Sequence, residues 1–212
     1  MKKKFFDSWY CISVYIAAAF ALALVLGAWD MREKLLLGSS FFIFLHFFEE
    51  FGFPGGFPYV GMKVELRITD LDARHWPLNQ VNAMFGNFCF AVLVYLLPLF
   101  LPSVRFLTLA AAIFAFAEIL MHLAVFNIAL KTWYNPGLLT AVFGLLPTSL
   151  WYFSQVWGQH LYGWGDAGLA LVWIVFNYWL AFRSPIYKML GELSDRYAFT
   201  DAEVSRAKRY MK

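Results

Sequence analysis

The chain has 212 residues, of which 61% are hydrophobic, 21% aromatic and only 15% charged. A soluble domain of this size carries a charged fraction of about a quarter, so the composition excludes an ordinary water-soluble protein and predicts an integral membrane protein. The net charge of +3 does not indicate a nucleic-acid partner, because the basic residues lie in loops and tails rather than in one patch. Cys11 and Cys89 lie in apolar runs and are too few for a disulfide framework.

Six apolar stretches are long enough to cross a bilayer, which takes ~20 residues of α-helix. In chain order they cover residues 9–29, 34–53, 79–101, 104–130, 137–157 and 167–183. The first follows MKKK, but its apolar core is too long for a signal peptide, and we interpret it as a span. We therefore expect an all-α bundle of about six transmembrane helices.

The distribution of lysine and arginine predicts how these helices are oriented. With the amino terminus in the cytoplasm, the inner segments and the last membrane boundary hold 14 of the 17 basic residues. The outer loops hold only Arg32, Lys34 and Arg105. The positive-inside rule therefore places both termini in the cytoplasm, in a multi-pass protein of the cytoplasmic (inner) membrane.

The inner loop 54–78 contains one segment with a strand-like pattern. KVELRIT (63–69) alternates polar and apolar residues with a period of two, which predicts a short strand. We expect the loop around 57–75 to cover the cytoplasmic mouth of the bundle.

The carboxy-terminal segment 184–212 reads as a cytoplasmic helical tail, following a transmembrane domain over residues 1–183. Ser184 is a predicted N-cap, with Pro185 at the first helical position. An apolar stripe then predicts a helix lying along the membrane surface, formed by Ile186, Met189, Leu190, Leu193 and Tyr197. TDAE (200–203) is a capping box that predicts a short basic terminal helix.

Five ionisable side chains lie inside predicted spans, where each costs about 2.5–3.5 kcal/mol at the bilayer centre. They are His46, Glu49, Glu50, Glu118 and His122. The glutamates of the second span follow its histidine by three and four positions, and the pair in the fourth span is four apart, so each group shares one helix face. At 1.5 Å per residue, the first group lies ~18–24 Å along its span and the second ~21–27 Å along its own, both in the cytoplasmic half.

These five residues are the predicted metal ligands, because imidazole and carboxylate together suit zinc, iron or manganese. They suffice for one ion, with Glu49 left over as the catalytic base, or for two ions bridged by carboxylate. The substrate of such an enzyme would be lipid-soluble or amphipathic and would enter from the cytoplasmic leaflet. Hydrolysis and oxidation both remain open.

Other polar residues converge on the same side and are candidate substrate contacts or supporting residues. Asn79 and Asn82 begin the third span, although Asn79 is equally well explained as an N-cap. Tyr134 is a candidate catalytic residue or a member of an aromatic belt, and Asn135 and Thr140 begin the fifth span. A last set is assigned lower weight: Asn127, which lies opposite Glu118 on its helix, and His75 and His160, which are predicted to be interfacial.

Two other interpretations need no metal. The adjacent glutamates could hold a proton near neutrality and serve an acid–base enzyme, such as an isoprenoid cyclase or isomerase, or a small proton-coupled transporter. Alternatively, the polar residues only join helices by hydrogen bonds.

HFFEE (46–50), the intramembrane His122 and YNPG (134–137) together resemble the HXXEE-motif family of bacterial integral membrane proteins. That family is defined by an H-x-x-E-E motif, a further histidine and a Y-x-P-G motif, and its function is unassigned. The resemblance covers residues 35–183. It implies that these positions form one site, and it implies no particular reaction.

Overall fold

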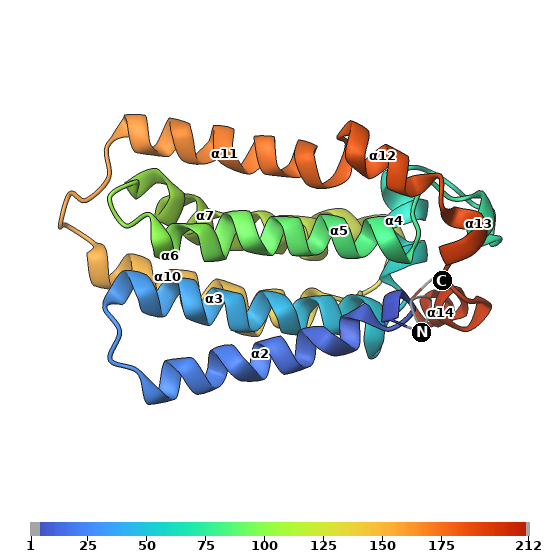
Figure 1. Ribbon diagram of the computed structural model, residues 1–212, viewed down its shortest axis with the longest axis horizontal. Helices are drawn as coiled ribbons and strands as arrows, with labels where there is room; N and C mark the ends of the chain where they lie inside the picture. The colour runs from blue at the N-terminus through green and yellow to red at the C-terminus, as the bar shows by residue number, and fades with distance from the viewer. Residues whose placement is uncertain (1–4, 211–212) are drawn as a thin grey trace.

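Five helices in the described part of the chain, residues 5–210 of the computed structural model, are long and apolar enough to cross a membrane. They are Trp9–Leu26, Met31–Gly52, Gln80–Phe100, Arg105–Leu130 and Trp164–Gly191. All five run along the long axis of the molecule (Figure 1). The all-helical prediction is confirmed. The lysines of MKKK and Lys212, which entered the charge count, lie outside the described residues.

Three of these five helices pass through a π-helical segment. The element bounds are α2 (Trp9–Leu26), α3 (Met31–Phe47) with η1 (Phe48–Gly52), α5 (Gln80–Ala91) with η3 (Val92–Leu96) and α6 (Leu97–Phe100), α7 (Arg105–Ile119) with η4 (Leu120–Phe126) and α8 (Asn127–Leu130), and α11 (Trp164–Phe182) with α12 (Pro185–Gly191). π-Helical turns are rare and often occur at functional sites. Here η1 contains Glu49 and Glu50, and η4 contains His122.

The predicted fifth span is helical but is not among these five. It consists of α9 (Leu138–Thr140), η5 (Ala141–Leu145) and α10 (Leu146–Val156). Small and polar residues lower its apolarity and let it approach its neighbours. A Cβ on Gly144 would overlap the ring of Phe42, and one on Gly38 would lie 3.2 Å from Thr148 Cγ2. The helix therefore packs closely against α3, through small residues on both helices.

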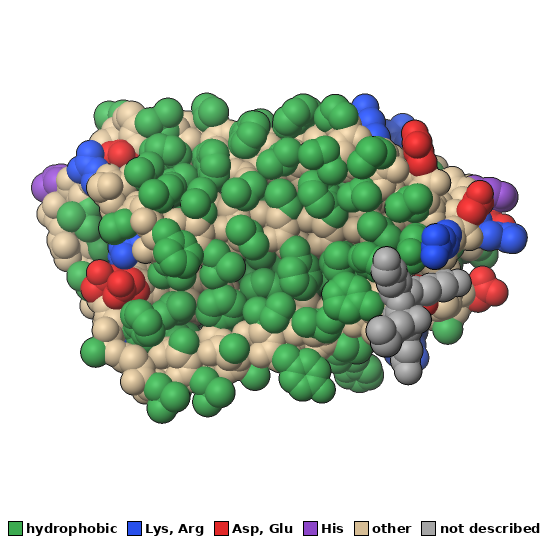
Figure 2. Space-filling model, in the orientation of Figure 1, with side chains coloured by type: hydrophobic (Ala, Val, Ile, Leu, Met, Phe, Trp, Pro, Cys, Tyr) green, Lys and Arg blue, Asp and Glu red, His purple; other side chains and the backbone are tan. Residues whose placement is uncertain are grey.

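Charge is segregated along the bundle axis. On the face shown in Figure 2, hydrophobic side chains cover the middle of the molecule, and charged side chains gather at its two ends. The first and last described residues, 5 and 210, lie at the same end of the bundle (Figure 1). This distribution is what a bundle surrounded by lipid requires.

The predicted strand at 63–69 is wrong. Residues 63–65 form the last turn of α4 (Phe57–Glu65), and residues 66–72 have no regular structure. The helix follows Gly56, whose φ of 104° is left-handed, and Pro58 lies in its first turn. The described residues contain no strand that could pair with the segment, so the local alternation has no partner. α4 crosses the end of the bundle, between α12 and α14 (Asp201–Arg206) (Figure 1).

The tail begins as predicted and then differs. Ser184 Oγ accepts a hydrogen bond from Tyr187 N at 3.2 Å, which confirms the N-cap. The single helix predicted to continue to Tyr197 is wrong in extent, because α12 ends at Gly191 and α13 (Ser194–Tyr197) follows. A Cβ on Gly191 would lie 2.9 Å from Pro77 O, so the chain turns where it contacts the inner loop. Tyr197 is consequently buried instead of facing outward.

The capping box of the terminal helix is confirmed, and α14 packs onto the end of the second span. Glu203 accepts hydrogen bonds from Thr200 N and from the buried Gln80 Nε2. Arg206 Nη1 donates to Gly52 O at 2.7 Å, which satisfies a carbonyl at the end of η1. The tail is thus fixed directly beside the helix that carries the HFFEE segment.

Candidate metal centre

Two histidines and two glutamates from the second and fourth spans face one another inside the bundle. His46 Nε2 lies 3.4 Å from Glu50 Oε1 and 3.5 Å from Glu118 Oε2. His122 Nε2 lies 3.6 Å and 3.5 Å from the same two oxygens. The imidazole rings are nearly perpendicular, with centroids 4.9 Å apart. The structure therefore brings together four of the five predicted ligands.

The ring of His46 is held from its far side by the start of the predicted fifth span. Its Nδ1 lies 2.9 Å from Thr140 Oγ1, and that hydroxyl lies 2.6 Å from Glu49 Oε2. Because a carboxylate only accepts, the threonine donates its one proton to Glu49 and accepts from His46 Nδ1–H. A neutral His46 then presents the lone pair of Nε2 to the centre.

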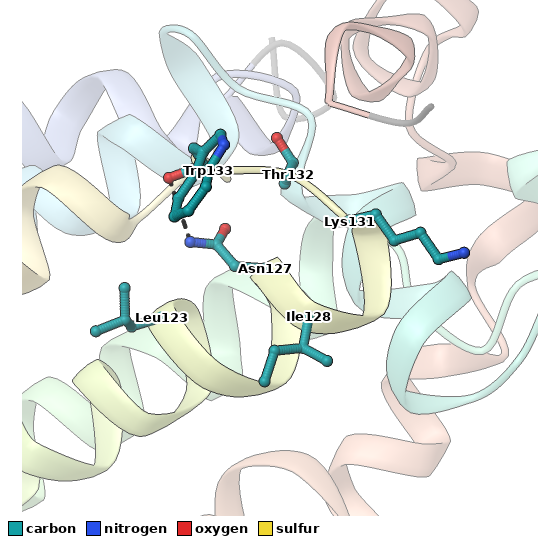
Figure 3. Close-up of a pocket in the computed structure, with 6 residues that line it drawn as sticks. All are labelled: Leu123, Asn127, Ile128, Lys131, Thr132 and Trp133. Atoms are coloured by element: carbon teal, nitrogen blue, oxygen red, sulfur yellow. Dashed lines mark hydrogen bonds between the residues drawn. The ribbon is translucent and has the colours of Figure 1, made fainter.

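His122 is oriented in the same way by a chain of amides. Its Nδ1 lies 2.6 Å from Asn135 Oδ1, and Asn135 Nδ2 donates to His122 O and to Asn127 Oδ1, both at 2.7 Å. Asn127 Nδ2 donates to Trp133 O at 3.3 Å (Figure 3). Since Asn135 uses its NH2 group as donor twice, its oxygen accepts from His122 Nδ1–H. Nε2 of His122 is again left as an acceptor.

When both rings are neutral, four hydrogen-bond acceptor atoms therefore face one another. None of the four residues then contributes a donor between these atoms. Such an arrangement is unfavourable in a buried site unless a cation occupies it. His46, Glu118 and His122 form a largely buried group whose ligand atoms all lie within 4.8 Å of one another, so the group could hold a metal ion. Ligating histidines whose Nδ1 is fixed by a second residue are typical of protein metal sites.

Glu49 is not part of this group of four. Its Oε1 accepts from Tyr134 OH at 2.9 Å and from Leu139 N at 3.0 Å. Its Oε2 accepts from Thr140 N at 2.8 Å and from the Thr140 hydroxyl. The carboxylate thus binds the amino-terminal end of the helix that starts at Leu138, where backbone N–H groups and the helix dipole favour a negative charge. Burial, followed by the charge of Glu49, raises the pKa of Tyr134.

Gly137 is a site residue that the sequence indicated only through the YNPG motif. Its φ of 102° is left-handed, and a Cβ there would overlap His122 Cε1 and lie 2.8 Å from His46 Cε1. Only glycine allows the backbone to pass this close to both rings. The YNPG segment was the available signal, because it places Tyr134, Asn135 and this glycine within four positions.

Residues 37–152 match the family described as "Protein of unknown function with HXXEE motif". The match covers more than half of the chain. The chain belongs to the HXXEE family. No curated protein and no solved structure matched it. The HXXEE match contains every residue placed above in the centre or against its rings.

The bundle end next to the HXXEE centre is covered by aromatic side chains. The Phe57 ring, at the start of α4, lies 5.8 Å from the His122 ring and 5.2 Å from Phe126. Tyr210 of the tail packs against Tyr134 at 5.4 Å. Of the four ligand candidates, Glu118 has the most exposed side chain, at 16%. The centre is closed toward the tail and most accessible at this carboxylate.

Two predicted site residues lie away from the HXXEE centre. Asn79 caps α5 and donates to Leu190 O at 2.8 Å, and Asn82 completes the capping box. Both join α5 to the tail, which agrees with the N-cap alternative for Asn79.

His75 is exposed and lies 2.7 Å from Asp70 in the inner loop. Asn127, which was assigned lower weight because it lies opposite Glu118, instead supports the ring of His122 through Asn135.

Proposed function

We propose that this HXXEE protein is a membrane-embedded, metal-dependent enzyme that acts on a lipid-soluble or amphipathic substrate. The observation that carries the proposal is the facing set of His46 Nε2, His122 Nε2, Glu50 Oε1 and Glu118 Oε2 at 3.4–3.6 Å. Ionisable residues inside a membrane are costly and are retained mainly for function. The polar residues behind both rings would be unnecessary if the four side chains only joined two helices.

The donor set supports zinc, iron or manganese as the bound metal. Two imidazole nitrogens with two carboxylate oxygens suit these ions, whereas calcium and magnesium prefer oxygen ligands alone. We propose one ion per chain, because both oxygens of Glu49 are already engaged by the segment 134–140. Such an ion would polarise a substrate oxygen or lower the pKa of a bound water, and iron or manganese would also permit oxidation.

The chain's own residues would perform the remaining tasks. Thr140 and Asn135 hold the two imidazole rings, and Glu49 fixes Thr140. Phe57 and the tail exclude water from the cytoplasmic end. Glu118, the most exposed of the four, is the residue that we assign to contact the substrate and to exchange protons with it.

We also propose that the helix Leu138–Val156 crosses the bilayer, which gives six spans in residues 1–183 and a cytoplasmic tail in 184–212. The excess of lysine and arginine in the inner segments supports cytoplasmic termini and a location in the cytoplasmic membrane. The centre would then lie in the cytoplasmic half of the bilayer. A substrate could reach it from that leaflet.

One alternative function follows from the same geometry. His46 Nε2 lies within ion-pair distance of two carboxylates, so a protonated His46 would also satisfy the group without a metal. The site would then serve acid–base chemistry on an isoprenoid or relay protons in a transporter.

Elemental analysis of the purified protein separates these functions. The metal proposal predicts close to one zinc, iron or manganese ion per chain, and loss of that ion in both His46→Ala and His122→Ala. His75→Ala is the matched control, because His75 is exposed and lies outside the centre. A folded wild-type protein that holds no metal after incubation with each ion would favour the acid–base alternative.

A further inference from the structure

One buried tyrosine has a hydroxyl that forms no hydrogen bond within the described part of the chain. Tyr95, in η3, is fully buried, and its hydroxyl has no hydrogen-bond partner among the described residues. Its ring is held by Phe114, with centroids 6.2 Å apart and planes at 64°. Buried polar groups without a partner are rare, and each calls for a specific explanation. Phenylalanine would fill the same space without leaving a polar atom unpaired.

Three serine hydroxyls on the surrounding helices share this condition. They are Ser39 and Ser40 on α3 and Ser149 on α10. At 1.5 Å per residue, all three and Tyr95 lie ~16–22 Å from the bundle end that holds the tail, and Glu118 lies ~18 Å from it. His46 and His122 lie nearer that end, at ~9–12 Å. The unpaired hydroxyls therefore lie beside the centre, on the side toward the middle of the membrane.

The helices that carry these hydroxyls pack against one another. η3 packs against both α3 and α7, and α10 packs against the same two helices. The Tyr95 ring packs against Phe114, which precedes Glu118 by four positions on α7, so Tyr95 and Glu118 lie along the same face of that helix. Tyr95 thus lies near the side of α7 that carries the most accessible carboxylate of the centre.

The positions of the basic residues restrict the ligand. All basic residues of the five candidate spans lie at or near the ends of their helices: Arg32, Lys34, Arg105, Arg183 and Lys188. An anionic headgroup drawn into the middle of the bundle would find no basic side chain there. An uncharged oxygen needs only a hydrogen-bond donor, which a phenol supplies.

We infer that Tyr95 donates a hydrogen bond to an uncharged oxygen atom, an alcohol, ester or ketone oxygen, of an otherwise apolar substrate and holds it beside Glu118. The inference rests on the proposed metal-dependent function and adds the substrate class. It gives the unpaired hydroxyl a partner only in the substrate complex. The absence of a hydrogen-bond partner for the Tyr95 hydroxyl in the structure is then explained by its role in binding the substrate.

The test uses the cobalt-substituted protein in lipid nanodiscs, with cobalt absorption as the readout. Dodecanol, methyl laurate and tridecanone are titrated as neutral probes, and laurate as the anionic probe. Wild type is compared with Tyr95→Phe, and Tyr59→Phe is the control, because the Tyr59 hydroxyl bonds Thr69 O in the inner loop. We expect at least one neutral probe to change the wild-type spectrum, and Tyr95→Phe to bind it ~3–10-fold more weakly with unchanged cobalt content.

Three results would overturn the inference: equal binding by Tyr95→Phe, a response to laurate alone, or no response to any neutral probe. A thermal midpoint lower in Tyr95→Phe than in wild type would also overturn it, because the hydroxyl would then have a structural partner. Failure of the wild type to take up cobalt would instead overturn the proposed function. The two failures are therefore distinguishable in one experiment.

Discussion

Thr140 Oγ1 lies 2.9 Å from Nδ1 of His46, although the two residues are 94 positions apart in the sequence. The same hydroxyl donates to Glu49, so one side chain joins a ring of the centre to a carboxylate outside it. This contact makes Thr140 the residue that selects which nitrogen of His46 is available.

Replacing Thr140 by valine should weaken metal binding ~10–100-fold, the usual effect of removing a residue that orients a ligand. Thr140→Ser keeps the hydroxyl and should bind nearly as tightly as wild type. Competition with a chelator of known affinity measures the effect. Thr148→Val is the matched control, because the Thr148 hydroxyl bonds Gly144 O within its own helix. Equal affinity in Thr140→Val and wild type would remove this residue from the centre.

Gly137→Ala should abolish metal binding and lower the free energy of unfolding. A left-handed φ alone costs a non-glycine residue about 1–2 kcal/mol, and here the added methyl also overlaps the His122 ring. Gly158→Ala separates the two causes, since Gly158 has a φ of 79° with nothing within 4 Å of the added Cβ. Thermal unfolding and metal content should show that only Gly137→Ala loses the metal. Metal retained in Gly137→Ala would contradict the close approach to the rings.

Glu49→Gln and Glu50→Gln should affect different properties although the residues are adjacent: the first should lower stability and the second metal affinity. A glutamine at 49 would place an NH2 group against donors that now bond the carboxylate, and should cost about 2–3 kcal/mol of unfolding free energy. Glu50 faces the two Nε2 atoms, so Glu50→Gln should lower metal affinity without destabilising the metal-free protein. Denaturant unfolding and metal content distinguish them. The same response from both variants would contradict the separate positions of the two carboxylates.

Removing Arg206 should loosen the tail from the end of the second span. Arg206→Met deletes a charged donor to Gly52 O and should lower the free energy of unfolding by about 1–2 kcal/mol. Lys208→Met removes an exposed charge from the same segment and should change it by less than about 0.5 kcal/mol. Limited proteolysis should also cleave the tail sooner in Arg206→Met. Indistinguishable behaviour of the two variants would mean that the Arg206 contact does not hold the tail.

Much of the centre could be predicted from the sequence, because it depends on helical spacing. His46 and Glu50 are four positions apart, as are Glu118 and His122, and both pairs lie at similar depth in their spans. An unpaired ionisable side chain inside a membrane is energetically costly, so the two pairs were expected to face each other in the bundle interior. Helix periodicity and hydropathy were sufficient for this part.

The remainder depends on contacts between distant segments. The separation of Glu49 from Glu50 could not be predicted, since it depends on the turn at 134–140 meeting η1. The prediction of a strand at 63–69 is wrong because it relied on a local alternation of polar and apolar residues, without a partner strand to pair with. The helix predicted to run to Tyr197 ends at Gly191, and contacts of Ser194, Glu203 and Arg206 with distant segments join the rest of the tail to the bundle.

X-ray absorption at the edge of the metal that copurifies with the protein tests the central claim most directly. The account predicts a first shell of nitrogen and oxygen at ~2.0–2.2 Å, with outer-shell scattering from two imidazole rings, as for zinc bound by histidine and carboxylate. In His122→Gln the signal of one ring should disappear, or the metal should be lost. A shell without imidazole scattering, or a folded protein that binds no transition metal, would contradict the account.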